Sequence, residues 1–368
     1  MNDFPRTVEG ITSEWLTQVL RESGAIKHAR VESFEIANIG DDQGVAADVS
    51  RIHLGFDQAE IGAPHSAVVK MTLPDLLGGM PETRRAVYER EIRFFQQVGP
   101  DSGMRTPSVF FAAIDSATGV FTLVLEDLNY LRAVDQADDC SYEDASACLL
   151  SLATMHAKWW NSAELPGYSW LLDRPMGADP ITAQENISNG LDSFLDMFGN
   201  YVPNGIESLV RKLTPKIPEI TASVSSSPVT LVHGDFKLGN IFFDDSAEGA
   251  KKIVAFDWQL VGRVKAASDV GTFVMQSFST ESRRQHEHQL LAEYHASLTD
   301  LGVENYSYDR FISDIQVSLL PRLAIRVSVF SRFGQRYLNT PDGLERAKKL
   351  LESLQMLIDW NCEEVIPN

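Results

Sequence analysis

Short strand-like apolar segments, separated by polar loops, make up most of the first third of the chain. Thr12 and Ser13 come directly before an apolar stripe at helical spacing, so a capped helix is expected ahead of the strands. A second helix is predicted at residues 82–98. The strands are expected at residues 31–39, 46–56, 67–73, 108–115 and 119–126. The pattern predicts a five-stranded sheet with one inserted helix.

After residue 128 the pattern changes, and long stretches with helical periodicity predominate. Helices are predicted at residues 142–161, 181–198, 207–223, 283–301, 308–330 and 342–362. Three short apolar runs, at residues 229–232, 241–243 and 253–256, follow a Ser-rich loop. We therefore expect an α+β protein with two lobes. The N-lobe, residues 1–128, holds an antiparallel sheet with one helix, and the larger C-lobe, residues 129–368, is mainly helical.

The clearest chemical signal is the segment LVHGDFKLGNIFFD at residues 231–244. Asp235 and Asn240 lie between two apolar runs, and a later apolar run ends on Asp257. Two carboxylates and an amide are thus placed at one mouth of a small sheet. Phosphoryl transfer needs such a set, because one carboxylate takes the acceptor proton while an Asn and an Asp hold Mg²⁺. The spacing also matches a kinase catalytic loop; the alternative is a hairpin whose loop is merely polar.

Four segments together carry a family resemblance: LVLEDL, LATMHAKWWN, HGDFKLGN and VAFDWQLVGRVKAASDVGTF. On these segments the chain resembles the aminoglycoside phosphotransferase and choline kinase superfamily, and it is most similar to the ecdysteroid-kinase-like branch. The resemblance runs from about residue 36 to residue 273. It implies a two-lobe protein-kinase-like fold. It also implies a phosphotransferase that uses ATP and Mg²⁺ and acts on a small-molecule hydroxyl.

Lys70 lies inside an apolar strand run, where an ammonium group needs a partner. The resemblance implies that this lysine binds the nucleotide phosphates and pairs with a glutamate of the 82–98 helix. Glu91 falls on the apolar face of that helix, whereas Glu89 neighbours Arg93 and faces water. We therefore expect Lys70 to pair with Glu91. The alternative is that Lys70 lies on an exposed edge strand.

Two further nucleotide contacts are expected in the N-lobe. Gly40 and Gly44 lie between strand-like runs, where backbone amides could face phosphates. An ordinary hairpin turn explains the same glycines. The LVLEDL segment gives a linker between the lobes, and the resemblance implies that backbone groups from Glu126 to Leu128 bind the adenine edge. Asp127 could instead cap the segment that follows.

The C-lobe motif assigns a role to each polar residue. Asp235 is the expected catalytic base, and Asn240 and Asp257 are the expected Mg²⁺ ligands, since this cation prefers oxygen. Lys237 either contacts the transferred phosphoryl group or is a solvated loop lysine. His233 is expected to hold the loop by hydrogen bonds.

The resemblance implies that Asp269 is a buried brace for the catalytic loop. The sequence DWQ stands where protein kinases have DFG, and no Ala-Pro-Glu motif follows. These departures argue against a protein substrate.

Composition limits the partners. At 368 residues, with 44% hydrophobic and 23% charged residues, the chain has ordinary globular values. Its net charge of −19 argues against nucleic acid and reflects either a solvated acidic surface or a cationic substrate. The three cysteines show no CxxC spacing, the N-terminus is not a signal peptide, and no apolar run is as long as a membrane span. A cytoplasmic enzyme is expected, and nothing in the sequence indicates an oligomeric state.

The acceptor pocket is expected between the catalytic loop and the helices at residues 142–223 and 308–330. His156 and Trp160 fall on one helical stripe, which indicates core packing or an aromatic box for a quaternary ammonium. Nearby aromatic residues favour a bulky alcohol as acceptor: Trp170, Phe194, Phe198, Tyr201, Phe330 and Phe333. The alternatives are a choline- or aminoglycoside-type kinase and a nucleotide-binding pseudokinase that acts as an interaction module. The complete set of polar residues counts against the pseudokinase.

Overall fold

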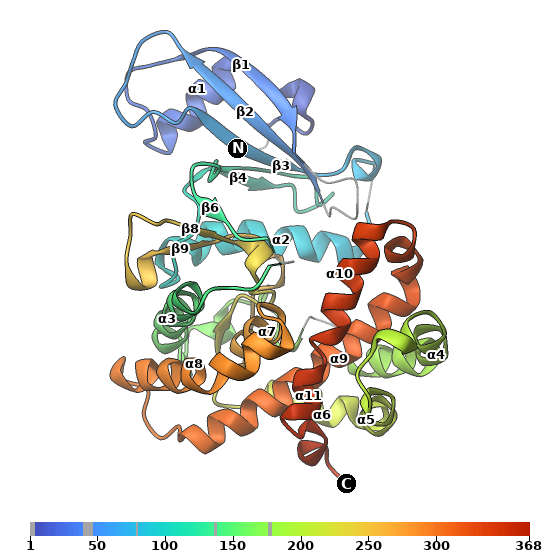
Figure 1. Cartoon of the computed structure of the whole chain (residues 1–368). Coiled ribbons are helices and arrows are strands. Elements are labelled where there is room, and N and C mark those ends of the chain that lie inside the picture. The colour runs from blue at the N-terminus through green and yellow to red at the C-terminus, as the bar shows by residue number, and fades with distance from the viewer. Residues whose placement is uncertain (1–3, 40–46, 79, 136–137, 176–178) are drawn as a thin grey trace. The chain divides into compact units, whose positions relative to one another are not determined.

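A computed structural model describes residues 4–39, 47–78, 80–135, 138–175 and 179–368. The chain divides into two compact units, Met1–Leu131 and Arg132–Asn368 (Figure 1). Sheet and helix are both present in each unit, and the second unit is mainly helical. The expected α+β class is confirmed. No helix in the described ranges is long and apolar enough to cross a membrane.

The first unit is built on a five-stranded antiparallel sheet in the order β1-β2-β3-β5-β4. Its strands are β1 Val31–Asn38, β2 Asp48–Phe56, β3 Ser66–Met71, β4 Val109–Ile114 and β5 Phe121–Glu126. Every predicted strand is present. Lys70 pairs with Val49 on one side and with Leu123 on the other. It therefore lies on the central strand, and the alternative of an exposed edge is wrong.

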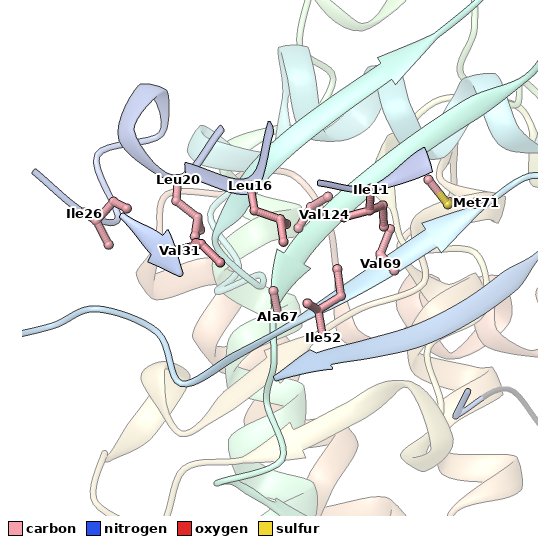
Figure 2. Packing of buried hydrophobic residues seen from close by; sticks show 10 residues of the cluster. All are labelled: Ile11, Leu16, Leu20, Ile26, Val31, Ile52, Ala67, Val69, Met71 and Val124. Atoms are coloured by element: carbon pink, nitrogen blue, oxygen red, sulfur yellow. The ribbon is translucent and has the colours of Figure 1, made fainter. Parts of the chain in front are cut away.

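Helix α1, Ser13–Glu22, covers part of this sheet with its apolar stripe. The backbone N–H of Trp15 donates to the hydroxyl of Thr12 over 3.2 Å, so Thr12 caps the helix as predicted. Figure 2 shows Leu16 and Leu20 among the buried side chains that also include Ile52 of the sheet. This core fixes the sheet that carries Lys70.

Helix α2, Glu82–Gln97, is the inserted helix that the pattern predicts. Its buried face includes Tyr88, Ile92 and Phe95, and the ring of Tyr88 lies 4.5 Å from that of Phe121 on β5. Apolar packing therefore orients the helix. Glu91 lies on the same buried face and points a carboxylate toward the sheet side of the helix.

The second unit contains two small antiparallel sheets, β10-β7 and β6-β8-β9. Their strands are β6 Arg132–Ala133, β7 Thr230–Val232, β8 Ile241–Phe243, β9 Ile253–Ala255 and β10 Gly262–Val264. The strands β7, β8 and β9 are those expected around the HGD motif. β6 and β10 were not predicted, because β6 is two exposed residues and Arg263 interrupts the apolar pattern of β10.

Helices make up most of the second unit (Figure 1). They are α3 Tyr142–Lys158, α4 Pro180–Phe198, α5 Ile206–Leu213, α6 Ile217–Val224, α7 Ala267–Gln276, α8 Thr280–Asp300, α9 Tyr308–Leu338, α10 Pro341–Glu352 and α11 Gln355–Asp359. One of them, α3, packs against β7 and β9. One helix was predicted at residues 207–223. That prediction is wrong, because Pro215 and Pro218 lack the N–H groups of a continuous helix and the chain forms α5 and α6 instead.

Helix α9 is longer than predicted and continues through Pro321 to Leu338. It packs against α4, where Phe194, Phe198 and Phe330 are fully buried. The rings of Phe198 and Phe330 meet edge to face, with centroids 5.0 Å apart. These three aromatics were expected to line an acceptor pocket. They form helix core instead, while Tyr201 and Phe333 are exposed.

Candidate active site

The loop between β7 and β8 begins with a turn that only glycine can make. Gly234 has a φ of 84°, in the region that side chains rarely adopt. A Cβ built on it would lie 2.0 Å from the carbonyl oxygen of Leu260. The glycine of the HGD motif is therefore a steric requirement. It allows the chain to turn sharply just before Asp235.

Asp269, on α7, holds the start of this loop. Its two carboxylate oxygens accept hydrogen bonds from the backbone N–H groups of His233 (2.6 Å) and Gly234 (2.9 Å). Behind it, Nε2 of His156 lies 3.5 Å from the carboxylate, and Nδ1 of His156 lies 2.7 Å from the hydroxyl of Tyr294. Burial would raise the pKa of Asp269, but His156, His233 and the Gly234 amide hold this pKa below its ordinary value. The carboxylate is therefore an ionised, fully buried support.

Across the described part of the chain, the contacts of His233 are structural. The backbone N–H of Asp235 donates to Nδ1 of His233 over 3.3 Å, so the proton of the ring lies on Nε2. Nε2 then donates to the carbonyl oxygen of Phe256 over 2.9 Å. The ring also packs 4.4 Å from that of Trp258. These contacts agree with the expected structural role.

Asp235 lies between a cation and an amide. Its Oδ2 is 2.8 Å from Nζ of Lys237, and Nδ2 of Asn240 donates to its backbone carbonyl (2.9 Å) and to Oδ2 (3.2 Å). Burial acts to raise the pKa of Asp235, but Lys237, Arg322 and His233 together lower it below the usual aspartate value. The loop thus brings together three of the predicted residues, with Asp235 ionised at neutral pH.

Sequence reasoning missed Arg322. Its Nη2 donates to the carbonyl oxygen of Gly234 over 2.6 Å, although the two residues lie far apart in the chain. The signal was present: an arginine inside a long apolar helical stretch needs a partner once it is buried. The pattern does not say which partner, because that depends on the tertiary fold.

Asp257 lies two residues after β9 and has an unusual backbone conformation. Its φ of 65° and ψ of 63° lie in the left-handed region, which costs free energy for a residue other than glycine. Such strain is typical of functional positions. The N–H of the preceding residue, Phe256, donates to the carbonyl oxygen of Asn240 over 3.0 Å, which brings the two predicted metal ligands into neighbouring positions.

The donor set fits the predicted Mg²⁺. Asn240 uses its amide nitrogen on Asp235, so its carbonyl oxygen remains as a ligand atom. Asp257 supplies a carboxylate. One carboxylate and one amide oxygen suit an ion that takes its other ligands from water and nucleotide phosphates. The assignment of these two residues as metal ligands stays a prediction.

The first unit carries the ion pair predicted from the sequence. Nζ of Lys70 lies 3.0 Å from Oε1 and 2.7 Å from Oε2 of Glu91. Glu89 instead pairs with Arg93, one turn further along α2, at 2.7 Å. The choice of Glu91 over Glu89 as the partner of Lys70 is therefore confirmed. That the pair binds nucleotide phosphates stays a prediction.

The linker side chains bond within the first unit. Glu126 accepts from the hydroxyl groups of Ser108 and Tyr130. Asp127 is buried, accepts from Arg51 (2.6 Å) and Ser66 (2.6 Å), and also accepts from the N–H of Asn129.

Of the backbone groups near the linker, the N–H of Glu126 donates to Ser108 and the carbonyl oxygen of Leu128 accepts from Leu131. Adenine binding at Glu126 and Leu128 stays a prediction. Gly40 and Gly44, the expected phosphate-loop glycines, lie outside the described residues.

Comparison with known proteins decides the family. The model of the ecdysteroid kinase-like family matches residues 43–305, well over half of the chain. The chain belongs to the ecdysteroid kinase-like family. The match covers both the Lys70–Glu91 pair and the HGD loop, and it confirms the resemblance drawn from the sequence. No curated protein sequence matches.

Solved structures share the fold at low identity. A candidate aminoglycoside phosphotransferase from Ralstonia eutropha is similar at a TM-score of 0.54 and 13% identity, covering 97% of this chain and 99% of that one. A variant aminoglycoside 2′-phosphotransferase in complex with GDP gives 0.51 and 10%, covering 95% and 97%. A macrolide 2′-phosphotransferase from Brachybacterium faecium gives 0.50 and 11%, covering 92% and 97%. The kinase-like two-lobe fold is confirmed.

Proposed function

We propose that this ecdysteroid kinase-like protein transfers the γ-phosphoryl group of ATP, with Mg²⁺, to a hydroxyl of a small alcohol that has a substantial apolar body. The observation that carries the proposal is the loop in which Asp235 is ion-paired to Lys237 and bonded to Asn240. A proton acceptor, a cation and a metal-ligand oxygen lie within one short segment. A loop that is polar only because it faces solvent would not need a proton acceptor, a cation and a metal-ligand oxygen together.

In this mechanism the acceptor hydroxyl attacks the γ-phosphorus, a new P–O bond forms, and the bond to ADP breaks. The hydroxyl proton passes to Oδ of Asp235. Because the pKa of Asp235 is lowered by Lys237 and Arg322, against the effect of burial, its carboxylate is a weak base. Its main contribution is to orient the hydroxyl and to accept the proton late in the reaction.

Asn240 and Asp257 would hold Mg²⁺, which when bound neutralises charge on the nucleotide phosphates. Lys237 is 2.8 Å from Asp235 and is only partly exposed. We infer that it also stabilises the transferred phosphoryl group, where negative charge accumulates. In the first unit Lys70, oriented by Glu91, is the proposed partner of the nucleotide phosphates. Gly40, Gly44 and the Glu126–Leu128 backbone complete the proposed nucleotide site.

The test is transfer of labelled γ-phosphate to a panel of apolar alcohols, choline-like amino alcohols and aminoglycosides. Asp235→Asn is the matched variant, because it preserves size and removes the charge. It should lower kcat by about 100-fold or more while ATP binding stays nearly unchanged. Turnover of the amino alcohols or aminoglycosides alone would replace the proposed acceptor by a cationic one. Nucleotide binding without transfer to any acceptor would favour a pseudokinase.

A further inference from the structure

A small cavity lies beside the catalytic loop, entirely within the second unit. Its lining includes Val232 and Gly234 from the loop region, Leu172 and Leu260 as apolar walls, and Arg322 of α9. Its volume is about 20 Å³. A cavity of this size holds roughly one group as large as a water molecule. It is therefore an anchor for one end of a ligand.

Two serine hydroxyls line this cavity and have no hydrogen-bond partner. Ser268, on α7, is 7% exposed and Ser318, on α9, is 4% exposed. Among the described residues, the Oγ atom of neither serine has a hydrogen-bond partner. A buried polar group without a partner costs free energy, and such groups are uncommon in folded proteins. Two of them at one cavity indicate that a ligand group satisfies both.

Positive charge lies along the same helix. Ser318, Arg322 and Arg326 follow one another at intervals of four residues, so they lie on one face of α9. Arg322 is bonded to the carbonyl oxygen of Gly234. Arg326 is half-buried and makes no hydrogen bond or ion pair with the residues that the structure describes. Burial and the neighbouring Arg322 lower the pKa of Arg326 to about 10, so its guanidinium remains charged at neutral pH.

The cavity thus presents hydroxyl and guanidinium donors and apolar walls. An ammonium group would be repelled by the two arginines, whereas a carboxylate would accept from the hydroxyls and offset the charge. We propose that the cavity anchors a carboxylate of the acceptor, so that the acceptor is a hydroxy acid with an apolar body. One carboxylate oxygen enters between Ser268 and Ser318 beside the guanidinium of Arg322, and the charge of Arg326, one helical turn beyond the lining residues, adds to the attraction. The phosphorylation step of this inference rests on the proposed function.

The apolar walls of the cavity also suit the apolar body of the proposed acceptor. Leu172, Leu260, Val264 and Pro321 offer hydrocarbon surface beside the donors. The hydroxyl of the same molecule must reach Asp235, which follows Gly234 directly in the loop. The acceptor therefore carries its acid and its alcohol on one apolar skeleton. The overall charge of −19 would disfavour an anion elsewhere on the protein, so recognition depends on this local positive charge.

The test compares four probes of one chain length: an ω-hydroxy carboxylate, its methyl ester, the diol and the amino alcohol. Calorimetry without nucleotide measures binding of each probe, and a transfer assay with ATP and Mg²⁺ measures KM and kcat. The carboxylate should bind best. Ser318→Ala removes a hydrogen bond to the carboxylate, and Arg326→Gln removes a positive charge near it. Each should raise its KM by about tenfold or more, with kcat less affected.

Arg332→Gln is the matched control, since Arg332 lies on the exposed side of the same helix. It should leave every probe unchanged, and neither site variant should change binding of the diol. Equal binding of all four probes, or equal loss for diol and carboxylate in Arg326→Gln, would show that the cavity holds a water and overturn the inference. Binding is read without turnover. Failure of transfer with intact carboxylate binding therefore contradicts the proposed function and leaves the anchor standing.

Discussion

Arg322 donates a hydrogen bond from Nη2 to the carbonyl oxygen of Gly234, the residue just before Asp235. The bond joins the middle of α9 to the catalytic loop. The charge of Arg322 acts on Asp235 together with that of Lys237, and both lower the pKa of the carboxyl against the effect of burial. The electrostatics of the proposed base are therefore set by two cations from distant parts of the sequence.

The metal assignment predicts that Asp257→Ala abolishes the Mg²⁺ dependence of ATP binding. Asp257 follows Phe256, whose N–H bonds to Asn240, and from there its carboxylate can reach an ion held on the phosphates. Calorimetry with and without Mg²⁺ measures the effect in both proteins. Equal ATP affinity of the unaltered protein with and without Mg²⁺ would contradict the role of Asp257. Asp245→Ala is a suitable control, because Asp245 pairs with Arg132 at 2.8 Å and takes no part in the proposed site.

The Lys70 ion pair predicts a contrast between two glutamates of α2. Glu91→Gln removes the negative partner of Lys70, which in the proposed nucleotide site would then lose its orientation toward the phosphates. Its KM for ATP should rise by about tenfold, the effect of losing one charge-assisted hydrogen bond. Glu89→Gln breaks only the pair with Arg93 on the helix surface and should leave KM unchanged. Equal effects of the two substitutions would remove Lys70 from the nucleotide site.

Lys237 predicts a change in the pH profile. With Lys237 present, the pKa of Asp235 lies below the ordinary value of about 3.9, so kcat/KM should stay level down to about pH 4. Lys237→Met removes the largest of the interactions that lower the pKa of Asp235, so burial, then opposed only by Arg322 and His233, moves this pKa upward. In this variant kcat/KM should then begin to fall at a pH above about 4. Lys212→Met, at an exposed lysine bonded to Glu363, should leave the profile unchanged. An unmoved acid limb in Lys237→Met would count against Asp235 as the titrating group.

Asp269 should make the stability of the fold depend on pH, because its pKa is lowered in the folded protein, as that of Asp235 is. Its folded pKa is below the unfolded value, so the carboxylate stabilises the fold at any pH above the unfolded pKa of about 3.9. That stability is lost as the pH falls through the folded pKa. Asp269→Asn should lower the free energy of unfolding at pH 7 and weaken its dependence on pH below about 4. Denaturant unfolding at several pH values measures both, and an unchanged acid dependence would show that Asp269 is already protonated.

A comparison of Gly234 with Gly62 tests how strictly the turn before Asp235 requires glycine. Both have a positive φ, 84° and 85°, but a Cβ at Gly62 meets no atom within 4 Å. Gly62→Ala should therefore cost only the backbone strain, about 1–2 kcal/mol. Gly234→Ala adds a clash with the Leu260 carbonyl and should cost clearly more, with loss of activity. Thermal unfolding measures the loss of stability in both variants. Similar losses would mean that the loop can move aside and avoid the clash.

Local patterns of the sequence contain most of the catalytic loop. Asp235 and Asn240 lie between apolar runs that do form strands, and the helical face of Glu91 identifies its pairing with Lys70. The rest depends on long-range contacts. Nothing near Gly234 indicates that Arg322 will reach it, and Ser268 and Ser318 share a cavity only because α7 packs against α9. Phe198 and Phe330 were expected to line a pocket but form helix core, because both environments give the same spacing of aromatic residues in the sequence.

The left-handed backbone of Asp257 has a consequence for engineering. Glycine would relieve a strain of about 1–2 kcal/mol at this position. Random libraries screened only for resistance to heat would therefore enrich replacements at Asp257, and under the proposed metal role these variants would be inactive. Thermostable forms of this protein should be selected by a screen that scores turnover and melting in parallel, with position 257 held fixed.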